Sequence, residues 1–242
     1  MIIAGLSGQV GTGKTSVAYM LREKGVTVIC HDEIVATSIK KGSSFYNKVV
    51  KFMGDGVLLQ DGNINFRHFF DSSTQNNKEQ GELWKSIRKR VIIEISKRIA
   101  IEWLKGTEIL ILDCPIVFDS WVKHFIDPLI VVYADPATQT KRIQQRDGLS
   151  GTEIASRISS QMALYEKAPL ASTQIDNSFT IENTQKQVDA LYLRLQTSSE
   201  KKTVKRKSIR IGVIIFGIFL LFLLFRLLLG FIKRIYFSIF KK

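Results

Sequence analysis

The sequence predicts an α/β fold in which a parallel β-sheet core is flanked by helices. Short apolar runs alternate with helical patterns through residues 1–196, and strands separated by helices pair in parallel. A glycine-rich loop lies between the first apolar run and the first helical pattern. The composition is that of a globular protein. The chain has 45% hydrophobic residues and 2 Cys in 242 residues, which excludes a collagen-like, disordered or disulfide-rich protein.

Each apolar run of strand length is expected to form one strand of this sheet. The expected strands are residues 1–6, 26–30, 108–112 and 129–133, with a last short strand at 179–181. The expected helices are residues 14–24, 32–39, 45–53, 83–104, 136–146, 152–166 and 184–195. Gly25 and Gly106 are expected to end the first of these helices and the long fourth one. The polar residues 71–80 are expected to form a loop.

The positive charge of the chain is concentrated in its last 46 residues. The net charge is +13, but residues 197–242 contain 11 basic and 1 acidic residue, which leaves only +3 for residues 1–196. So small a charge does not indicate a general nucleic-acid-binding protein. The expected organisation is a globular domain at 1–196, a basic linker at 197–210, an apolar segment at 211–232 and a short basic tail at 233–242.

The apolar segment at 211–232 is expected to form one C-terminal transmembrane helix. Its 22 residues contain a single charge, Arg226, and a helix of this length spans about 33 Å, close to the hydrocarbon thickness of a bilayer. A buried core helix is the alternative, but the segment is apolar on every side. The basic linker also fits a nuclear import signal, although beside a membrane span it favours a cytosolic preceding domain. We expect no signal peptide and a single-pass, tail-anchored protein of the mitochondrial outer membrane or endoplasmic reticulum.

Residues 8–15 match the phosphate-binding pattern G-x-x-x-x-G-K-[ST] at every fixed position, between an expected strand and an expected helix. The glycines allow backbone N–H groups to surround phosphate oxygens at the positive end of the helix, whereas a chance glycine turn is the alternative. Lys14 is expected to reach the β- and γ-phosphates, and the Thr15 hydroxyl to bind Mg²⁺. The expected nucleotide-binding residues are Gly8, Gln9, Val10, Gly11, Thr12, Gly13, Lys14, Thr15 and Ser16.

Two carboxylates follow expected strands, at the sheet edge where open α/β folds bind ligands. Asp113 comes after the apolar run at 108–112 and is expected to orient a magnesium-bound water or to contact the acceptor. Asp32 comes directly after the second strand, where a carboxylate can accept the proton of an acceptor hydroxyl. Each aspartate also suits a simpler role as the cap of a following helix.

Arg142 and Arg146 lie four residues apart in an expected helix and therefore share one of its faces. Guanidinium groups on a lid neutralise the charge that spreads over a transferred phosphoryl group. A basic face in contact with solvent is the alternative, and the spacing alone does not decide between the two.

Six segments, in order, resemble the dephospho-coenzyme A kinase family over nearly all of residues 1–195. IIAGLSGQVGTGKTSVA resembles the family's opening, and HDEI resembles its acidic motif after the second strand. FMGDGVLLQDGNINFRHF and LDCPIVFDS resemble its glycine–aspartate segment and its Leu-Asp strand end. VVYADPATQTKRIQQRDGLS and SSQMALYEKAPLASTQIDNS resemble its lid entry and lid exit. The ordered set is more specific than the phosphate-binding pattern alone.

The resemblance implies a P-loop kinase fold with a core, an acceptor-binding helical part and a lid. It implies transfer of the ATP γ-phosphoryl group to the 3′-hydroxyl of dephospho-coenzyme A, the last step of coenzyme A synthesis. Asp32 takes the general-base position and Asn177 a position on the nucleotide side. The expected catalytic residues are Asp32, Lys14, Arg142 and Arg146. The expected substrate-binding residues are Asp32, Asp113 and Arg88, and the expected Mg²⁺ ligands are Thr15 and Asp113.

The sequence departs from the family pattern on the acceptor side. Cys30 and His31 precede Asp32, Ala36 stands where the family usually has Arg, and Arg88–Lys89 replaces its His-Pro. Two other functions therefore stay open: a kinase of another nucleoside or nucleotide acceptor, and a non-catalytic nucleotide-binding module at a membrane. The expected kinase is a monomer that acts on a small molecule and binds no nucleic acid.

Overall fold

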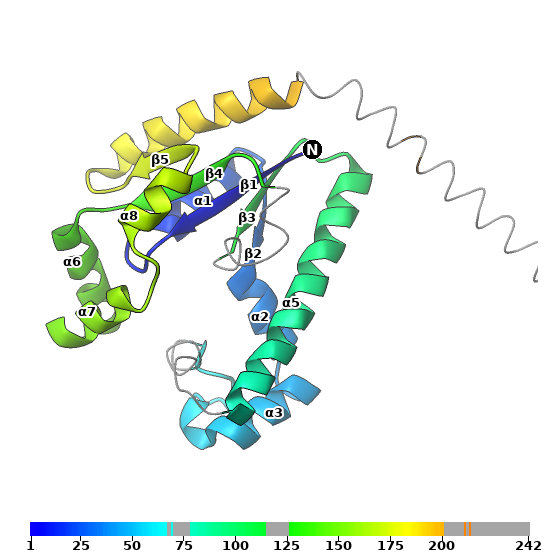
Figure 1. The fold of residues 1–242 in the computed structure, drawn as a ribbon, viewed down its shortest axis with the longest axis vertical. Helices are drawn as coiled ribbons and strands as arrows, with labels where there is room; N and C mark the ends of the chain where they lie inside the picture. The colour runs from blue at the N-terminus through cyan, green and yellow to red at the C-terminus, as the bar shows by residue number, and fades with distance from the viewer. Residues whose placement is uncertain (67–68, 70–77, 115–125, 201–210, 212, 214–242) are drawn as a thin grey trace, which may run out of the picture.

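A five-stranded parallel sheet forms the centre of the molecule, with the strand order β2-β3-β1-β4-β5 (Figure 1). The structure, a computed structural model, describes residues 1–66, 69, 78–114, 126–200, 211 and 213. The strands are β1 (Ile2–Gly8), β2 (Thr27–Cys30), β3 (Ile109–Asp113), β4 (Leu129–Tyr133) and β5 (Thr173–Asp176). The predicted parallel α/β sheet is confirmed.

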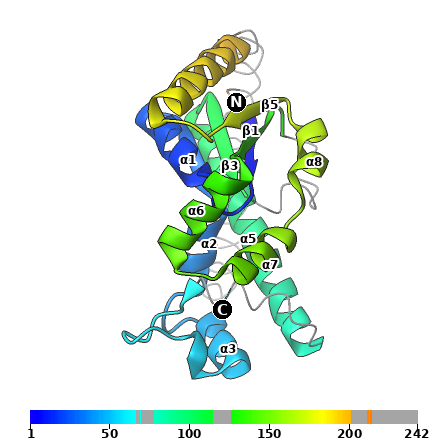
Figure 2. The same ribbon diagram turned by 90° about the vertical axis from the view of Figure 1, so that its left-hand side faces the viewer.

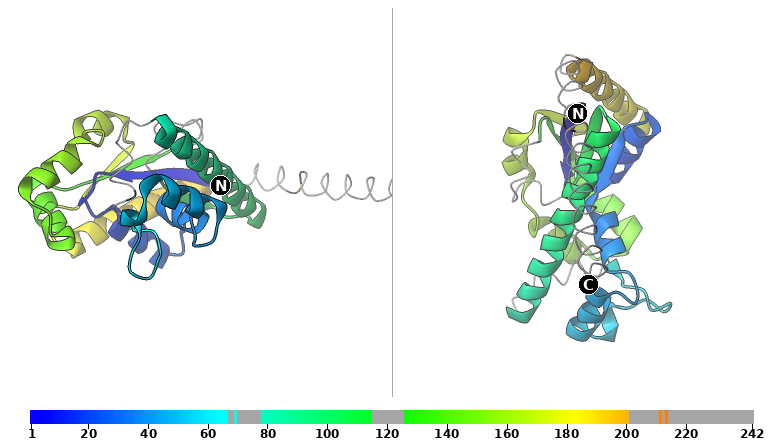
Figure 3. Two further views of the ribbon diagram at one scale, coloured as in Figure 1. Left: turned by 90° about the horizontal axis from the view of Figure 1, so that it is seen from below. Right: turned by 90° about the vertical axis from the view of Figure 1, so that its right-hand side faces the viewer.

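Helices surround this sheet and connect its strands. They are α1 (Lys14–Glu23), α2 (His31–Ser38), α3 (Ser44–Met53), α5 (Lys78–Lys105), α6 (Pro136–Asp147), α7 (Gly151–Ser159), α8 (Leu164–Lys167) and a last helix over 181–200. Two short 3₁₀ turns are η1 (Asp55–Val57) and η5 (Ala168–Leu170). Figure 3 shows α3 and the neighbouring part of α5 extending together beyond the sheet. Figure 2 shows α6 and α7 on the side of the molecule where β1 ends.

Alternate residues of β3 face two separate hydrophobic cores. Leu110 and Leu112 belong to the core formed with α2, α3 and α5. Ile109 and Ile111 belong to the core formed with α1 and the helix over 181–200. This two-residue alternation is the geometry of a strand buried on both faces. It explains why the run is continuously apolar and why the sequence predicted a covered parallel sheet.

The strand register brings the ends of three strands together at one edge of the sheet. Leu6 of β1 is paired with Asp113 of β3, and Asp113 is also paired with Cys30 of β2. Because all three strands run in the same direction, the segments that follow them emerge side by side. These segments hold most of the residues that the sequence predicts to be functional.

Four of the five expected strands are confirmed to within two residues at each end, and the fifth was placed wrongly. The last strand is β5, whereas the expected strand at 179–181 includes Phe179 and Ile181, which are 66% and 64% exposed. Ile175 is the fully buried residue of β5. An edge strand with one such residue has no continuous apolar run, so the hydrophobic pattern did not reveal it.

The helix expected at 152–166 is divided into α7 and α8. The hydroxyl groups of Ser159 and Ser160 donate hydrogen bonds to the carbonyl oxygens of Ser156 and Arg157, 3.0 and 2.9 Å away. Such local bonds compete with the continuation of a helix. Helix α5 begins at Lys78, inside the loop expected at 71–80, and residues 71–77 lie outside the described residues.

In the part of the chain that the structure describes, no helix has the length and apolar character needed to cross a membrane. The span expected at 211–232 lies outside the described residues except for Ile211 and Val213. Most of the expected linker and all of the expected basic tail, residues 201–210 and 233–242, also lie outside them.

Candidate active site

The phosphate-binding loop (residues 8–15) connects β1 to the first turn of α1, as the sequence predicted. Gly11 and Gly13 have φ angles of 78° and 83°, a region that favours glycine. A Cβ at Gly8 would lie 2.7 Å from the carbonyl oxygen of Val132, so the loop starts in close contact with β4. The loop ends at the N-terminus of α1, where the N–H groups and the helix dipole favour an anion.

Side chains from other segments hold the backbone of this loop. The Asn177 side-chain amide donates to the Thr12 carbonyl at 2.8 Å, and the Gln139 amide of α6 donates to the Val10 carbonyl at 2.6 Å. The Val10 N–H donates to the Gln161 side-chain oxygen at 2.9 Å. The loop is therefore tied to the segments that follow β4 and β5. Gln139 and Gln161 were not predicted from the sequence, because an isolated glutamine belongs to no phosphate-binding motif.

Asn177, expected on the nucleotide side, is buried directly after β5. Its side-chain oxygen accepts a 2.6 Å hydrogen bond from the hydroxyl of Thr184, which is itself fully buried. A Cβ at Gly13 would collide with the Asn177 amide. The structure therefore places Asn177 against the phosphate-binding loop, with both polar atoms of its side chain engaged.

Lys14 and Asp113 form an ion pair at the edge of the sheet. The Asp113 side chain is 5% exposed and the Lys14 side chain 21% exposed. The other carboxylate oxygen of Asp113 accepts a contact from the Cys30 thiol at 3.8 Å. Burial raises the pKa of that thiol, and the Asp113 and Asp32 charges raise it further. Two expected functional residues are thus in direct contact, and the sequence had not predicted this pairing.

Asp32 lies in the first turn of α2, beside the same sheet edge. Cys30 occupies the N-cap position of this helix, so Asp32 does not take the alternative role of its cap. The buried His31 ring donates from Nδ1 to the Asp32 carboxylate at 3.0 Å. This hydrogen bond lowers the pKa of Asp32, and the charges of His31 and Lys14 lower it further against the opposing effect of burial. The carboxylate is 62% exposed and is therefore accessible to an acceptor.

Arg142 and Arg146 have different surroundings, although they lie one turn apart on α6. Nη1 of Arg142 is buried and has no hydrogen-bond partner among the described residues. It would lie 3.7 Å from a Cβ at Gly13, so it faces the phosphate-binding loop. A buried guanidinium nitrogen without an acceptor is unfavourable, and a bound phosphate would supply the acceptor.

Arg146 instead pairs with Asp147, whose carboxylate it contacts through two nitrogens at 2.8 and 2.9 Å. Arg157 of α7 donates to the same carboxylate at 2.9 Å. The Asp147 side chain is fully buried between these partners. Arg146 and Arg157 therefore join α6 to α7 through the Asp147 carboxylate.

The residues expected to bind Mg²⁺ supply the donors that this ion prefers. Thr15 offers a hydroxyl from the first turn of α1, and Asp113 offers a carboxylate from the end of β3. The described residues contain no cluster of three or more His, Cys, Asp or Glu side chains able to hold a metal. Mg²⁺ at a nucleotide site needs no such cluster, because it keeps several waters and binds one or two protein groups with the phosphates. Thr15 and Asp113 fit that requirement.

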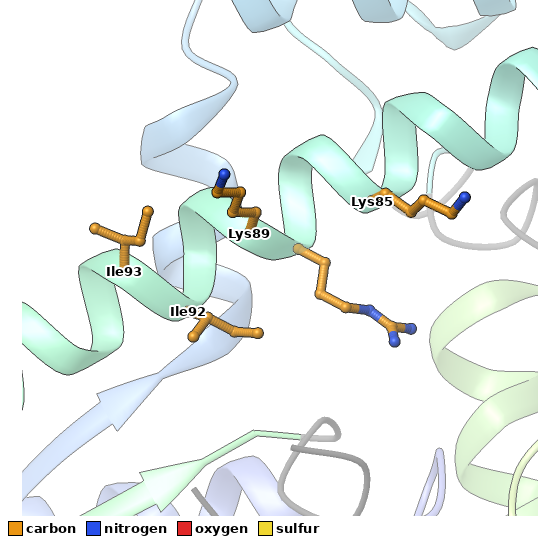
Figure 4. A pocket seen from close by; sticks show the side chains of 5 residues that line it. Lys85, Lys89, Ile92 and Ile93 are labelled. Carbon is orange, nitrogen blue, oxygen red and sulfur yellow. The ribbon is translucent and has the colours of Figure 1, made fainter. Parts of the chain in front are cut away.

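Arg88 lies on α5, away from the phosphate-binding loop in sequence, and lines a surface depression of about 300 Å³. The other lining residues come from the same helix and combine positive and apolar side chains: Lys85, Lys89, Ile92 and Ile93 (Figure 4). Helix α5 packs against α2, which carries Asp32. The depression therefore offers a basic and partly apolar surface on a helix adjoining the Asp32 helix.

Comparisons with known proteins agree with this site. The family model for dephospho-CoA kinase matches residues 2–183. A dephospho-CoA kinase domain-containing protein of Danio rerio is 36% identical over 197 residues, which cover 81% of this chain and 86% of the relative. A dephospho-CoA kinase of Bacillus thuringiensis is 33% identical over 190 residues, which cover 78% of this chain and 95% of the relative.

A solved structure supports the fold independently. The crystal structure of TT1252 from Thermus thermophilus aligns with a TM-score of 0.61 and 23% identity, over 80% of this chain and 97% of the other. The phosphate-binding loop, the parallel sheet and the matched length together lead to one assignment. The chain belongs to the dephospho-CoA kinase family.

Proposed function

We propose that this chain is an active dephospho-coenzyme A kinase that uses Mg²⁺-ATP. The reacting oxygen is the 3′-hydroxyl of the dephospho-coenzyme A ribose. It forms a bond to the γ-phosphorus of ATP while the bond from that phosphorus to the β–γ bridging oxygen breaks. The products are ADP and coenzyme A, and the hydroxyl proton passes to the Asp32 carboxylate.

The unpartnered Nη1 of Arg142 is the observation that carries this proposal. It lies against the phosphate-binding loop, on the side of Gly13, and it is buried in the absence of any acceptor among the described residues. A phosphate group provides the missing acceptor and the negative charge that a guanidinium group prefers. A phosphate at this position and the accessible Asp32 carboxylate are what the proposed phosphoryl transfer requires.

Each site residue has one role in this mechanism. Lys14 leaves Asp113 to contact the β- and γ-phosphates, and Arg142 neutralises charge on the transferred group. Thr15 and Asp113 would hold Mg²⁺, which would supply charge neutralisation at the phosphates. Asp32 orients the acceptor hydroxyl and takes its proton. The catalytic effect comes from positioning and electrostatics, with no covalent intermediate on the protein.

Acceptor competition tests the proposal. ADP release is measured with Mg²⁺-ATP and dephospho-coenzyme A, in parallel with AMP, CMP and adenosine, and Asp32→Asn is the control for a contaminating kinase. We expect turnover with dephospho-coenzyme A alone. Turnover with another acceptor instead would assign a different kinase activity, and ATP binding without turnover of any acceptor would assign a non-catalytic module.

We expect an Arg88→Ala variant to raise the KM for dephospho-coenzyme A with little change in kcat. The acceptor carries a diphosphate, and the depression on α5 presents Arg88 beside two lysines. Loss of one charge-assisted contact of this kind weakens binding about tenfold. Initial rates at varied acceptor concentration give both constants.

Lys97→Ala is the matched control for this prediction, because Lys97 is exposed on the same helix and does not line the depression. Its KM is expected to equal that of the unchanged chain. An Arg88→Ala variant with normal KM and a lower kcat would contradict a role in acceptor binding.

We also propose that residues 211–232 anchor the protein in a membrane with the kinase on the cytosolic side. The length and near-complete lack of charge of this segment support the proposal, as do the basic residues on both sides. The full chain is expected to stay with membranes during alkaline extraction, whereas a chain ending at residue 200 is expected in the supernatant. Release of the full chain at alkaline pH would contradict the anchor.

A further inference from the structure

A buried histidine lies directly beside the carboxylate that the mechanism uses as its base. His31 is the first residue of α2, and its side chain is 10% exposed, whereas the side chain of Asp32 is 62% exposed. His31 is one of the positions at which the chain departs from the family pattern, so the family motif predicts no role for it.

The His31 ring holds one oxygen of the Asp32 carboxylate. An ionised carboxylate only accepts hydrogen bonds, so Nδ1 of His31 is the donor in the 3.0 Å contact with Oδ1 of Asp32. Histidine carries a hydrogen on Nδ1 both as the imidazolium ion and in one of its two neutral forms, so this bond does not require a charged ring. An exposed aspartate otherwise exchanges among several rotamers. The bond to a buried ring therefore selects one orientation of the carboxylate.

Helix α2 provides a fixed frame for this pair. Its buried residues Ile34 and Val35 belong to the core that α2 shares with α5, which anchors the backbone of the first turn. The residue one turn after Asp32 on the same helical face is Ala36, whose side chain has no donor for a carboxylate. The side-chain donor to Asp32 comes instead from the preceding residue, His31.

We propose that His31 is a positioning residue for the general base, which holds Oδ1 of Asp32 and so turns Oδ2 toward the acceptor hydroxyl. This inference rests on the proposed function and deepens it, because it assigns the proton to one oxygen: the O–H bond of the acceptor breaks and an O–H bond to Oδ2 forms. His31 touches neither ATP nor the acceptor in this assignment. Its effect passes entirely through the Asp32 carboxylate, so it acts on kcat and not on substrate binding.

Kinetics of the full chain in detergent test the inference. Turnover of dephospho-coenzyme A with Mg²⁺-ATP is measured for the unchanged chain, His31→Leu and His31→Asn, and ATP affinity by titration calorimetry. We expect His31→Leu to lower kcat about tenfold to a hundredfold, the effect of a base that has lost its orientation, with KM and ATP affinity changed less than about twofold. Asparagine can place an amide N–H close to the position of Nδ1, so His31→Asn is expected to recover kcat to within about threefold of normal.

Glu33→Gln is the matched control, because Glu33 is the next acidic residue of α2, is 53% exposed and pairs with Arg22 of α1. Its kcat is expected to be normal. A normal kcat in His31→Leu, or a kcat in His31→Asn as low as in His31→Leu, would overturn the inference.

A double-mutant cycle separates positioning from a structural role. Asp32→Ala removes the carboxylate, so a residue that acts only through it has nothing left to orient. His31→Leu is therefore expected to change the residual kcat of Asp32→Ala by less than about twofold. A loss in this background as large as in the unchanged chain would overturn the inference and assign His31 a structural role.

Carbon-13 NMR of the aspartate carboxyl groups gives a readout that needs no turnover. The bond from His31 is the largest cause of the lowered pKa of Asp32, so the Asp32 signal is expected to titrate at a higher pH in His31→Leu than in the unchanged chain. The neighbouring charges of Lys14 and Asp113 and the Cys30 thiol are the same in both chains. Identical titration would overturn the inference. The expected difference in a chain that does not phosphorylate dephospho-coenzyme A would contradict only the proposed function.

Discussion

An Arg142→Met variant is expected to turn over dephospho-coenzyme A about a thousandfold more slowly than the unchanged chain, the lower end of the effect of an arginine on phosphoryl transfer. Nη1 of Arg142 is buried beside the phosphate-binding loop without a partner among the described residues. Negative charge shifts among the phosphate oxygens as the γ-phosphoryl group is transferred. A guanidinium group held in place before the reaction stabilises this charge without reorganisation. Methionine keeps much of the volume of the side chain and removes the charge.

Single-turnover rates at saturating ATP separate this effect from nucleotide binding. Lys141→Met is the matched control, because Lys141 is the exposed neighbour of Arg142 on α6 and is expected to react at the normal rate. Arg142→Lys keeps the charge but loses the planar fork of donors, and an intermediate rate is expected. A normal rate in Arg142→Met at saturating ATP would show that Arg142 only binds the nucleotide.

The sequence predicted the centre of the site because that part depends on local pattern and strand direction. The phosphate-binding loop needs glycines at positions of positive φ, and both Gly11 and Gly13 have them. Asp32 and Asp113 follow strands that run in parallel, so they had to emerge at one edge. The ion pair between Lys14 and Asp113 could not be predicted in this way, because a pattern of strands does not specify which side chains are in contact.

The remainder of the site depends on contacts between segments far apart in the chain. Arg142 and Arg146 lie on the same face of one expected helix, but only the fold shows that Arg146 pairs with Asp147, which Arg157 also contacts. Gln161 contacts the loop because the helix expected at 152–166 ends at Ser159 and the chain turns before α8 begins.

An Asp32→Asn variant is expected to lose turnover by about a hundredfold to ten-thousandfold, the range that a positioned general base contributes. Asparagine preserves the size of the side chain and a hydrogen-bond acceptor for the His31 ring, but it cannot take the proton of the acceptor hydroxyl. ATP affinity is expected to stay close to normal, because Asp32 lies in α2 and not in the phosphate-binding loop. Turnover and ATP titration of the same preparation measure the two quantities.

The pKa of Asp32 gives this prediction a second test. The hydrogen bond from His31 lowers that pKa below its ordinary value of 3.8, with further lowering by the charges of His31 and Lys14. A carboxyl group with a lowered pKa is ionised at every pH above the ordinary value, so the base is ready to accept a proton throughout pH 5–8. The pH profile of kcat/KM is therefore expected to show no acidic loss due to Asp32 in that range. An acidic limb between pH 5 and 8 that is present in the unchanged chain and absent from the residual activity of Asp32→Asn would contradict the assigned protonation state.

A loss of less than about tenfold in Asp32→Asn would instead show that positioning and charge neutralisation carry the reaction without a general base.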